Sequence, residues 1–138
     1  MSSGSGESSA TIAEPIELVW RALPKALDSL GITVNTADQT RYLIGAEATK
    51  VRQRLGKAPL SRYLDCGQAQ IGPNADSYDV TLTVLVQLQK GIPGTTNVST
   101  TVEATAKPIA YAQAPSECSS KGTLENALMA ILQAPIVK

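Results

Sequence analysis

Two cysteines and no histidine set the chemistry that this chain can carry out. The cysteines are Cys66 and Cys118, and the 138 residues contain no histidine. A nucleophilic or redox thiol needs a lowered pKa, and a histidine is the usual partner that lowers it. The spacing of the two residues is also not the Cys-x-x-Cys of redox motifs. Zinc would need two further ligands of other types. The residue types therefore favour a structural role for the pair.

A disulfide between Cys66 and Cys118 is the structural role that we favour. It would close a loop of about 50 residues, for which the chain-entropy model gives roughly 4 kcal/mol of stabilisation. Both residues fall in sequence that predicts loops, on either side of a predicted hairpin. The alternatives are two unrelated buried thiols or one reactive thiol. Because disulfides persist in oxidising compartments, a bridge would indicate an exported protein.

A run of basic residues is the second candidate for function. Five cations follow one another with no acid between them: Lys50, Arg52, Arg54, Lys57 and Arg62. If residues 50–54 are extended, the first three share one face of a strand. Such a face would suit anionic headgroups or the acidic surface of a partner. The simpler interpretation, which we favour, is a solvated edge strand on which charges discourage aggregation.

Composition excludes several classes of function. The formal net charge is zero, with 12 basic and 12 acidic residues. This argues against sequence-independent nucleic-acid binding, which depends on neutralising phosphates. No apolar run approaches the length of a membrane span. The carboxylates near the predicted hairpin, among them Asp65, Asp76 and Asp79, suit turn or solvated roles better than an acid–base pair. We expect no enzymatic activity, no cofactor and no metal.

Apolar periodicity predicts two helices that must pack on something. A stripe at helical spacing, which includes Trp20, predicts an amphipathic helix over about 15–30. Gly31 stands where this helix would end, and Pro15 suits its first turn. Pro24 predicts a kink or a local break. A second stripe over 124–132 predicts a closing helix that Pro135 ends. Both apolar stripes need the face of a sheet to cover them.

Alternating apolar and polar residues predict that sheet. Residues 78–89 and 97–106 alternate with period two and are joined by a short Gly/Pro turn, which predicts a long antiparallel hairpin. Shorter strands are expected at 10–13, 32–36 and 42–46, with a turn at 37–41 and a loop at 108–120. After residue 46 the chain either continues as a strand toward Val51 or becomes irregular. Residues 60–64 fit one helical turn or a short strand.

The element order is therefore β-α-β-β-β-β-α. We expect a single α+β domain over residues 10–134, in which two helices pack on an antiparallel sheet. Residues 1–9 are rich in Ser and Gly and predict a flexible linker or tag. Residues 135–138 form a short tail.

Two stretches of the chain also suggest relatives. The first is 15–23 (PIELVWRAL), followed by Gly31 and a strand. The second is 60–67 (LSRYLDCG), followed by the strand from Asp79 and by Cys118 before the last helix. These features resemble the soluble domains of bacterial envelope proteins, often lipoproteins. The element order is similar to that of the helix-grip domains of BamC, a lipoprotein of the outer-membrane barrel assembly machine. The resemblance implies a two-layer, exported, non-enzymatic domain and transfers no functional residue.

Two hypotheses about function follow. The first is an exported, non-enzymatic interaction or structural module that is periplasmic, anchored at the outer membrane or extracellular. It would be an accessory subunit with an unidentified protein partner in the cell envelope, no nucleic acid, and membrane contact only through an N-terminal anchor or the basic run. The alternative is a small carrier of apolar ligands with a cavity between the first helix and the sheet. The cavity would be lined by Trp20, Val80, Leu82 and Val84.

Overall fold

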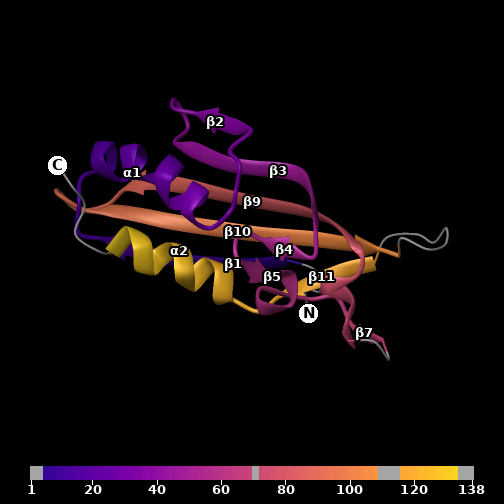
Figure 1. Cartoon of the computed structure of the whole chain (residues 1–138). Coiled ribbons are helices and arrows are strands. Elements are labelled where there is room, and N and C mark those ends of the chain that lie inside the picture. Colours follow the sequence, from indigo (N-terminus) through magenta and orange to yellow (C-terminus); the bar gives the residue numbers. More distant parts are fainter. Residues whose placement is uncertain (1–4, 70–71, 109–115, 134–138) are drawn as a thin grey trace.

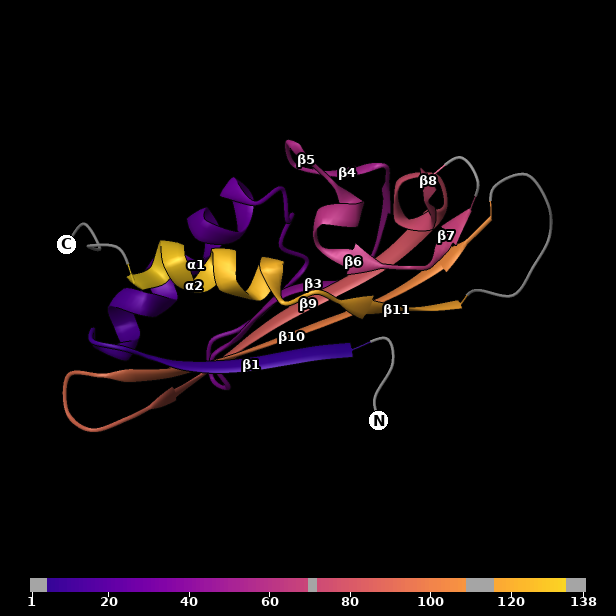
Figure 2. The ribbon, with the colours of Figure 1, turned by 90° about the horizontal axis from the view of Figure 1, so that it is seen from below.

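A computed structural model of the chain describes residues 5–69, 72–108 and 116–133. Two helices pack on one face of a seven-stranded antiparallel sheet, and neither helix covers the opposite face (Figures 1 and 2). Strands β2, β3, β9, β10, β11 and β6 follow one another across this sheet, and β1 also pairs with β10. The α+β class, with two helices on an antiparallel sheet, is the predicted one.

The predicted hairpin forms the centre of the sheet. Strands β9 (Asp79–Lys90) and β10 (Thr96–Lys107) pair without interruption over their whole length. Every second side chain of β9 is buried on the side of the sheet that carries the helices, as the alternation predicts. The buried set of β9 is Val80, Leu82, Val84, Val86 and Leu88. The other set of side chains points to the uncovered face, and it is largely polar.

Strand β3 (Leu43–Arg52) pairs with the free side of β9 and carries a bulge between Ala46 and Thr49. Ala48 has a positive φ of 49°, and its N–H donates to the Thr83 hydroxyl at 2.9 Å. This bond satisfies a backbone donor that the bulge takes out of the ladder. Beyond the bulge, β3 pairs with β9 again and continues to Arg52, so of the two predicted alternatives after residue 46 the strand that continues toward Val51 is the one that forms.

Strand β2 (Thr36–Asp38) starts where the predicted 32–36 strand was expected to end, and the predicted turn at 37–41 moves accordingly. The Asn35 side chain replaces a strand ladder there, because it bonds both the N–H and the carbonyl of Glu47 at 2.9 Å. Asp38 accepts from the Thr40 hydroxyl and backbone, which starts the turn after the strand. The same hydroxyl bond lowers the pKa of Asp38.

Two strands occupy the other edge of β10, one after the other. Strand β1 (Ser5–Ile12) pairs with 96–103, and β11 (Ser116–Ser120) pairs with 104–106. The predicted linker is therefore wrong at Ser5–Ser9, and the predicted loop is wrong at Ser116–Ser120. Backbone ladders do not depend on composition, so the central hairpin recruits a Ser-rich segment that reads as a linker. Residues 1–4 and 109–115 lie outside the described part.

Helix α1 (Ile16–Ser29) continues through Pro24 without a break and has Pro15 at its N-cap, one residue before the first turn. Its end is a Schellman motif, since the Ile32 N–H bonds the Leu27 carbonyl and the Gly31 N–H bonds the Asp28 carbonyl. Helix α2 (Thr123–Gln133) lies beside α1 on the same face of the sheet (Figure 2). The predicted helix-ending residue Pro135 lies outside the described residues.

Short elements fill the chain between β3 and β9. They are β4 (Arg54–Leu55), β5 (Ala58–Pro59), the 3-10 turn η1 (Leu60–Arg62), β6 (Leu64–Asp65), β7 (Gln68–Ala69), β8 (Gly72–Pro73) and the 3-10 turn η2 (Asn74–Asp76). Residues 60–64 thus contain both predicted alternatives, a helical turn and the start of a strand. This segment lies on the helix side of the sheet, next to the end of α1 (Figure 2).

Candidate functional site

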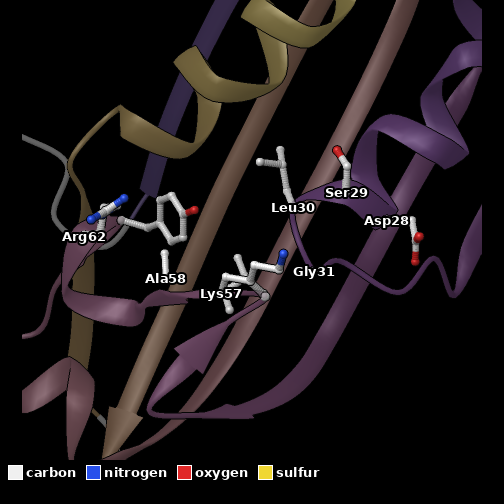
Figure 3. Close-up of a pocket in the computed structure, with 10 residues that line it drawn as sticks. Asp28, Ser29, Leu30, Gly31, Lys57, Ala58 and Arg62 are labelled. Carbon is white, nitrogen blue, oxygen red and sulfur yellow. The ribbon is translucent and has the colours of Figure 1, made fainter.

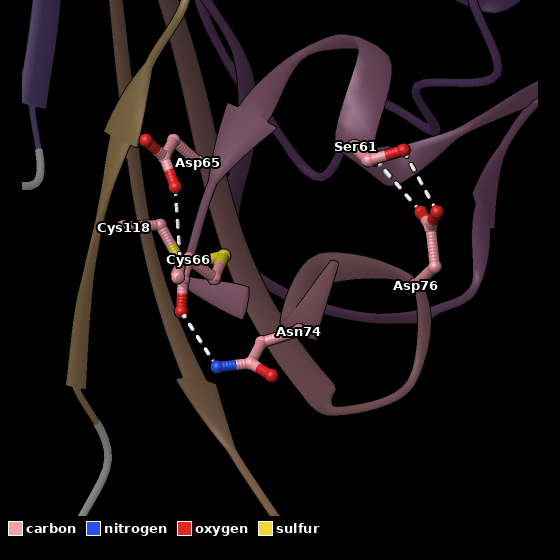
Figure 4. Close-up of a disulfide and its surroundings, with 7 residues drawn as sticks. Ser61, Asp65, Cys66, Asn74, Asp76 and Cys118 are labelled. Atoms are coloured by element: carbon pink, nitrogen blue, oxygen red, sulfur yellow. Dashed lines mark hydrogen bonds between the residues drawn. A yellow bond between two sulfur atoms is a disulfide. The ribbon is translucent and has the colours of Figure 1, made fainter. Parts of the chain in front are cut away.

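The disulfide between Cys66 and Cys118 is present, with an S–S distance of 2.05 Å and a Cα–Cα distance of 4.3 Å (Figure 4). Cys118 is fully buried and lies in β11, while Cys66 is half-buried and directly follows β6. Cys118 is therefore in a strand and not in the predicted loop. The bridge fastens the edge of the sheet to the segment of short elements that precedes β9.

Hydrogen bonds make that segment one unit (Figure 4). Asp76 of η2 accepts from the backbone N–H and the hydroxyl of Ser61 at 2.8 and 2.7 Å, so it caps η1. Asn74 donates to the carbonyl of Cys66 at 3.2 Å. Asp65 accepts from the N–H of Gly67 at 2.9 Å. Both carboxylates hold turns together, which is the role that their sequence context predicts.

The five predicted basic residues separate into two places. Lys50 and Arg52 lie on the uncovered face of β3, opposite Thr81 and Asp79 of β9. Arg54 does not share that face, because β3 ends at Arg52 and Gln53, with a φ of 69°, turns the chain into β4. Lys57 and Arg62, the last two residues of the run, are both exposed and lie beside a pocket on the helix side.

Arg52 forms an ion pair with Asp79, with 2.6 Å between Nη2 and Oδ1. Both side chains are about half exposed, so water screens the pair. We expect Arg52→Gln to lower the free energy of unfolding by less than about 1 kcal/mol. The effect should shrink further in about 1 M salt. Urea unfolding measures it, with Lys90→Gln as the control of equal charge change, because Lys90 is exposed and lies at the other end of β9 from Asp79. A loss above about 2 kcal/mol would contradict this assignment.

The pocket lies between the carboxyl end of α1, the β4–β5 turn and η1 (Figure 3). Its volume is about 460 Å³. It is lined by Asp28, Ser29, Leu30, Gly31, Leu55, Gly56, Lys57, Ala58, Arg62 and Tyr63. Of these, only Lys57 and Arg62 were predicted as candidate site residues. The sequence did contain a signal for the turn that carries Lys57, because Gly56-Lys57 between two apolar residues is typical of a two-residue hairpin turn.

Two glycines bring the walls of this pocket together. Gly31 has a φ of 84°, as the last position of the Schellman motif requires. A Cβ at this position would lie against the backbone nitrogen of Gly56, well inside van der Waals contact. Gly56 in turn packs on the carbonyl of Leu30 and itself has a φ of 61°. The end of α1 can therefore touch the β4–β5 turn backbone to backbone, and this contact positions Lys57.

The charges at the pocket are not neutralised by neighbouring side chains. Within the described residues the ion pairs are Arg41–Asp38 and Arg52–Asp79, and neither includes Lys57 or Arg62. In Figure 3 the Lys57 side chain extends toward Gly31, while Asp28 lies at the far wall. The backbone carbonyls at the end of α1 add partial negative charge on that wall. The pocket therefore offers two exposed cations, Lys57 and Arg62, to an anionic group.

The four residues predicted to line an apolar cavity have other surroundings. Val80, Leu82 and Val84 are buried in the hydrophobic core. Trp20 is half-buried, and its ring meets the edge of Tyr42 with centroids 5.6 Å apart. None of the four lines the pocket beside Lys57 and Arg62. The carrier hypothesis therefore stays a prediction for which this pocket offers no support.

The described part of the chain contains no group of three side chains placed to hold a metal ion. Over the same residues, neither helix has the length and apolar character needed to span a bilayer.

Comparison with known proteins shows remote similarity to solved structures. No protein-family model matches the chain, and no curated protein does either. Among solved structures, a conserved protein from Geobacillus kaustophilus is similar with a TM-score of 0.49 and 13% identity, over 94% of this chain and 92% of that one. An uncharacterised protein from Bacillus thuringiensis is similar with a TM-score of 0.38 and 14% identity, over 94% and 96%. Similarity this remote carries no argument about function.

Proposed function

We propose that this protein is an exported, non-catalytic binding module that holds an acidic group of a protein partner between Lys57 and Arg62. The observation that carries the proposal is the pocket of about 460 Å³, whose lining includes these two exposed cations. The Cys66–Cys118 disulfide supports an oxidising, exported location. An accessory subunit of an envelope complex, as the likeness to BamC implies, would use such a surface.

The two cations stand on backbone that is already ordered. Lys57 is in a two-residue turn whose other residue, Gly56, packs on the end of α1. Arg62 ends η1, which Asp76 caps through Ser61. Because the backbone beneath both side chains is fixed, binding has less conformational entropy to lose. The planar fork of an arginine also matches a carboxylate in two hydrogen bonds, which favours a partner Asp, Glu or chain terminus.

The polar groups of the pocket favour binding over catalysis. The Ser29 hydroxyl donates to the carbonyl of Ala26 at 2.7 Å, so it is engaged within the helix. The chain has no histidine to act as its base. Tyr63 is 8% exposed and contributes mainly to the wall. The chemistry that this set supports is recognition of charge.

We expect Lys57→Glu/Arg62→Glu to weaken partner binding about tenfold or more, because two attractive contacts become repulsive. The experiment compares how much envelope protein is retained by immobilised wild type and by this variant, followed by titration with the retained protein. The control is Arg21→Glu/Lys90→Glu, which changes the net charge equally at exposed positions outside the pocket. Equal binding by the wild type and both variants would remove the pocket from the proposed function.

A further inference from the structure

The outer edge of β1 is a long strand edge without a partner in the described structure. All eight residues of β1 pair with β10 in unbroken register, and no strand in the described residues pairs with its other side. The remaining outer strands are short, since β2 has three residues and β6 has two. Lys, Pro and bulges normally protect such edges. Within β1 the chain has one carboxylate, Glu7, and none of these protections.

Helix α2 lies over this same edge (Figures 1 and 2). Its outward side has no charge: Asn126, Ala130, Ile131 and Gln133 are exposed, and Glu125, the charged residue of the helix, is buried. Ile131 is 37% exposed.

Helix α1 serves as the comparison, because its outward face is exposed to water and carries charged residues. Its exposed positions include Glu17, Arg21, Lys25 and Asp28. The uncharged side of α2 is therefore unusual in the same molecule, and it adjoins the unpaired edge of β1. Depletion of charge is a feature of protein interfaces.

We infer that β1 pairs antiparallel with β1 of a second copy, so that the sheet continues across a two-fold axis. In an antiparallel pair, opposite residues point to the same face of the sheet. A two-fold axis normal to the sheet must therefore lie at a residue that pairs with the same residue of the second copy, and we name each register by that residue. An axis through Glu7 would set two carboxylates against each other, which is unfavourable. An axis through Ser8 places Glu7 opposite Ser9, and an axis through Ser9 places it opposite Thr11. Both registers avoid like charges.

A second copy fits this edge better than an unrelated strand. Two copies of the uncharged side of α2 can lie against each other without charge repulsion. The same surface has no charged residue that would attract an acidic or a basic partner. The two-fold contact closes on itself, so it gives a dimer and no fibre.

The test is the molar mass in solution by light scattering or sedimentation, from low micromolar to about 100 µM, a range typical of weak specific dimers. We expect a dimer at the upper end. Ser9→Asp places like charges in contact in both registers, against Glu7 or against itself, and should weaken the dimer about tenfold or more. Its control is Ser99→Asp, on the β10 residue that pairs with Ser9 within one copy. That control should leave the dimer intact.

A second pair of variants tests the helix. Ile131→Lys should weaken the dimer, whereas Ile92→Lys should not, because Ile92 is 76% exposed and lies in the turn between β9 and β10. Trp20 fluorescence shows that each variant is folded. A monomer at every concentration overturns the inference. A dimer that Ser9→Asp leaves unchanged, or that Ser99→Asp weakens as much, overturns the pairing of β1 with its copy.

Discussion

Replacing both Cys66 and Cys118 by Ala is expected to lower the free energy of unfolding by about 4 kcal/mol. The bridge joins residues 52 apart in sequence, and its loss returns the entropy of that loop to the unfolded chain. Domains of this kind are stable by only about 5–15 kcal/mol, so the expected loss is a large share of the total. Ala suits both positions, because Cys118 is fully buried and a polar replacement would add a desolvation cost.

Urea unfolding followed by Trp20 fluorescence measures this effect. The wild type should lose a similar amount of stability when reductant is added, whereas the double Ala variant should not respond to reductant at all. Intact mass without reductant should show a protein two hydrogens lighter than its reduced form, because closing one bridge removes two thiol hydrogens. A fall in stability of less than about 1 kcal/mol in the variant would show that the bridge does not limit the unfolded chain.

Gly31→Ala is expected to lower the free energy of unfolding by about 2–5 kcal/mol, by two separable effects. The first is the φ of 84°, which costs an L-residue roughly 1–2 kcal/mol. The second is the contact of the new Cβ with the backbone of Gly56, which forces the end of α1 and the β4–β5 turn apart at a further cost of about 1–3 kcal/mol. The same separation should move Lys57 and reduce partner binding.

A matched variant separates the two effects. Gly94 has a φ of 85° and nothing within 4 Å of an added Cβ, so Gly94→Ala measures the conformational cost alone. The difference in unfolding free energy between the two variants is the cost of the contact between the helix end and the turn. If Gly31→Ala and Gly94→Ala lose the same stability, the two backbones are free to separate and Gly56 does not position Lys57.

Local patterns explain which elements were predictable. Strands β9 and β10 and both helices have apolar side chains with one clear period, because each element buries one face against the other layer. Gly31 marks the end of α1 because the left-handed turn that ends the helix excludes other residues. Residue chemistry favoured the disulfide, because a reactive thiol lacks a histidine partner, but two unrelated buried thiols stayed possible until the structure brought Cys66 and Cys118 together.

The parts that the sequence did not predict depend on contacts between distant segments. Ser5–Ser9 has the composition of a linker and becomes a strand because β10 offers it an unpaired edge. Lys50 and Lys57 belong to one basic run, yet they lie on opposite sides of the sheet because Gln53 turns the chain between them.

The sequence alone predicts an α+β domain with a central hairpin, two helices that cover the sheet and a cysteine pair suited to a disulfide. Periodicity and residue chemistry suffice for that, because both act over a few neighbouring residues. Only the tertiary structure shows that Lys57 and Arg62 have no ion-pair partner among the described residues and that the outer edge of β1 is unpaired there. The pocket at Lys57 requires the end of α1 to meet a turn 25 residues later, through Gly31 and Gly56. No local pattern encodes that meeting, because its stabilisation comes from packing between segments that the whole fold must first bring together.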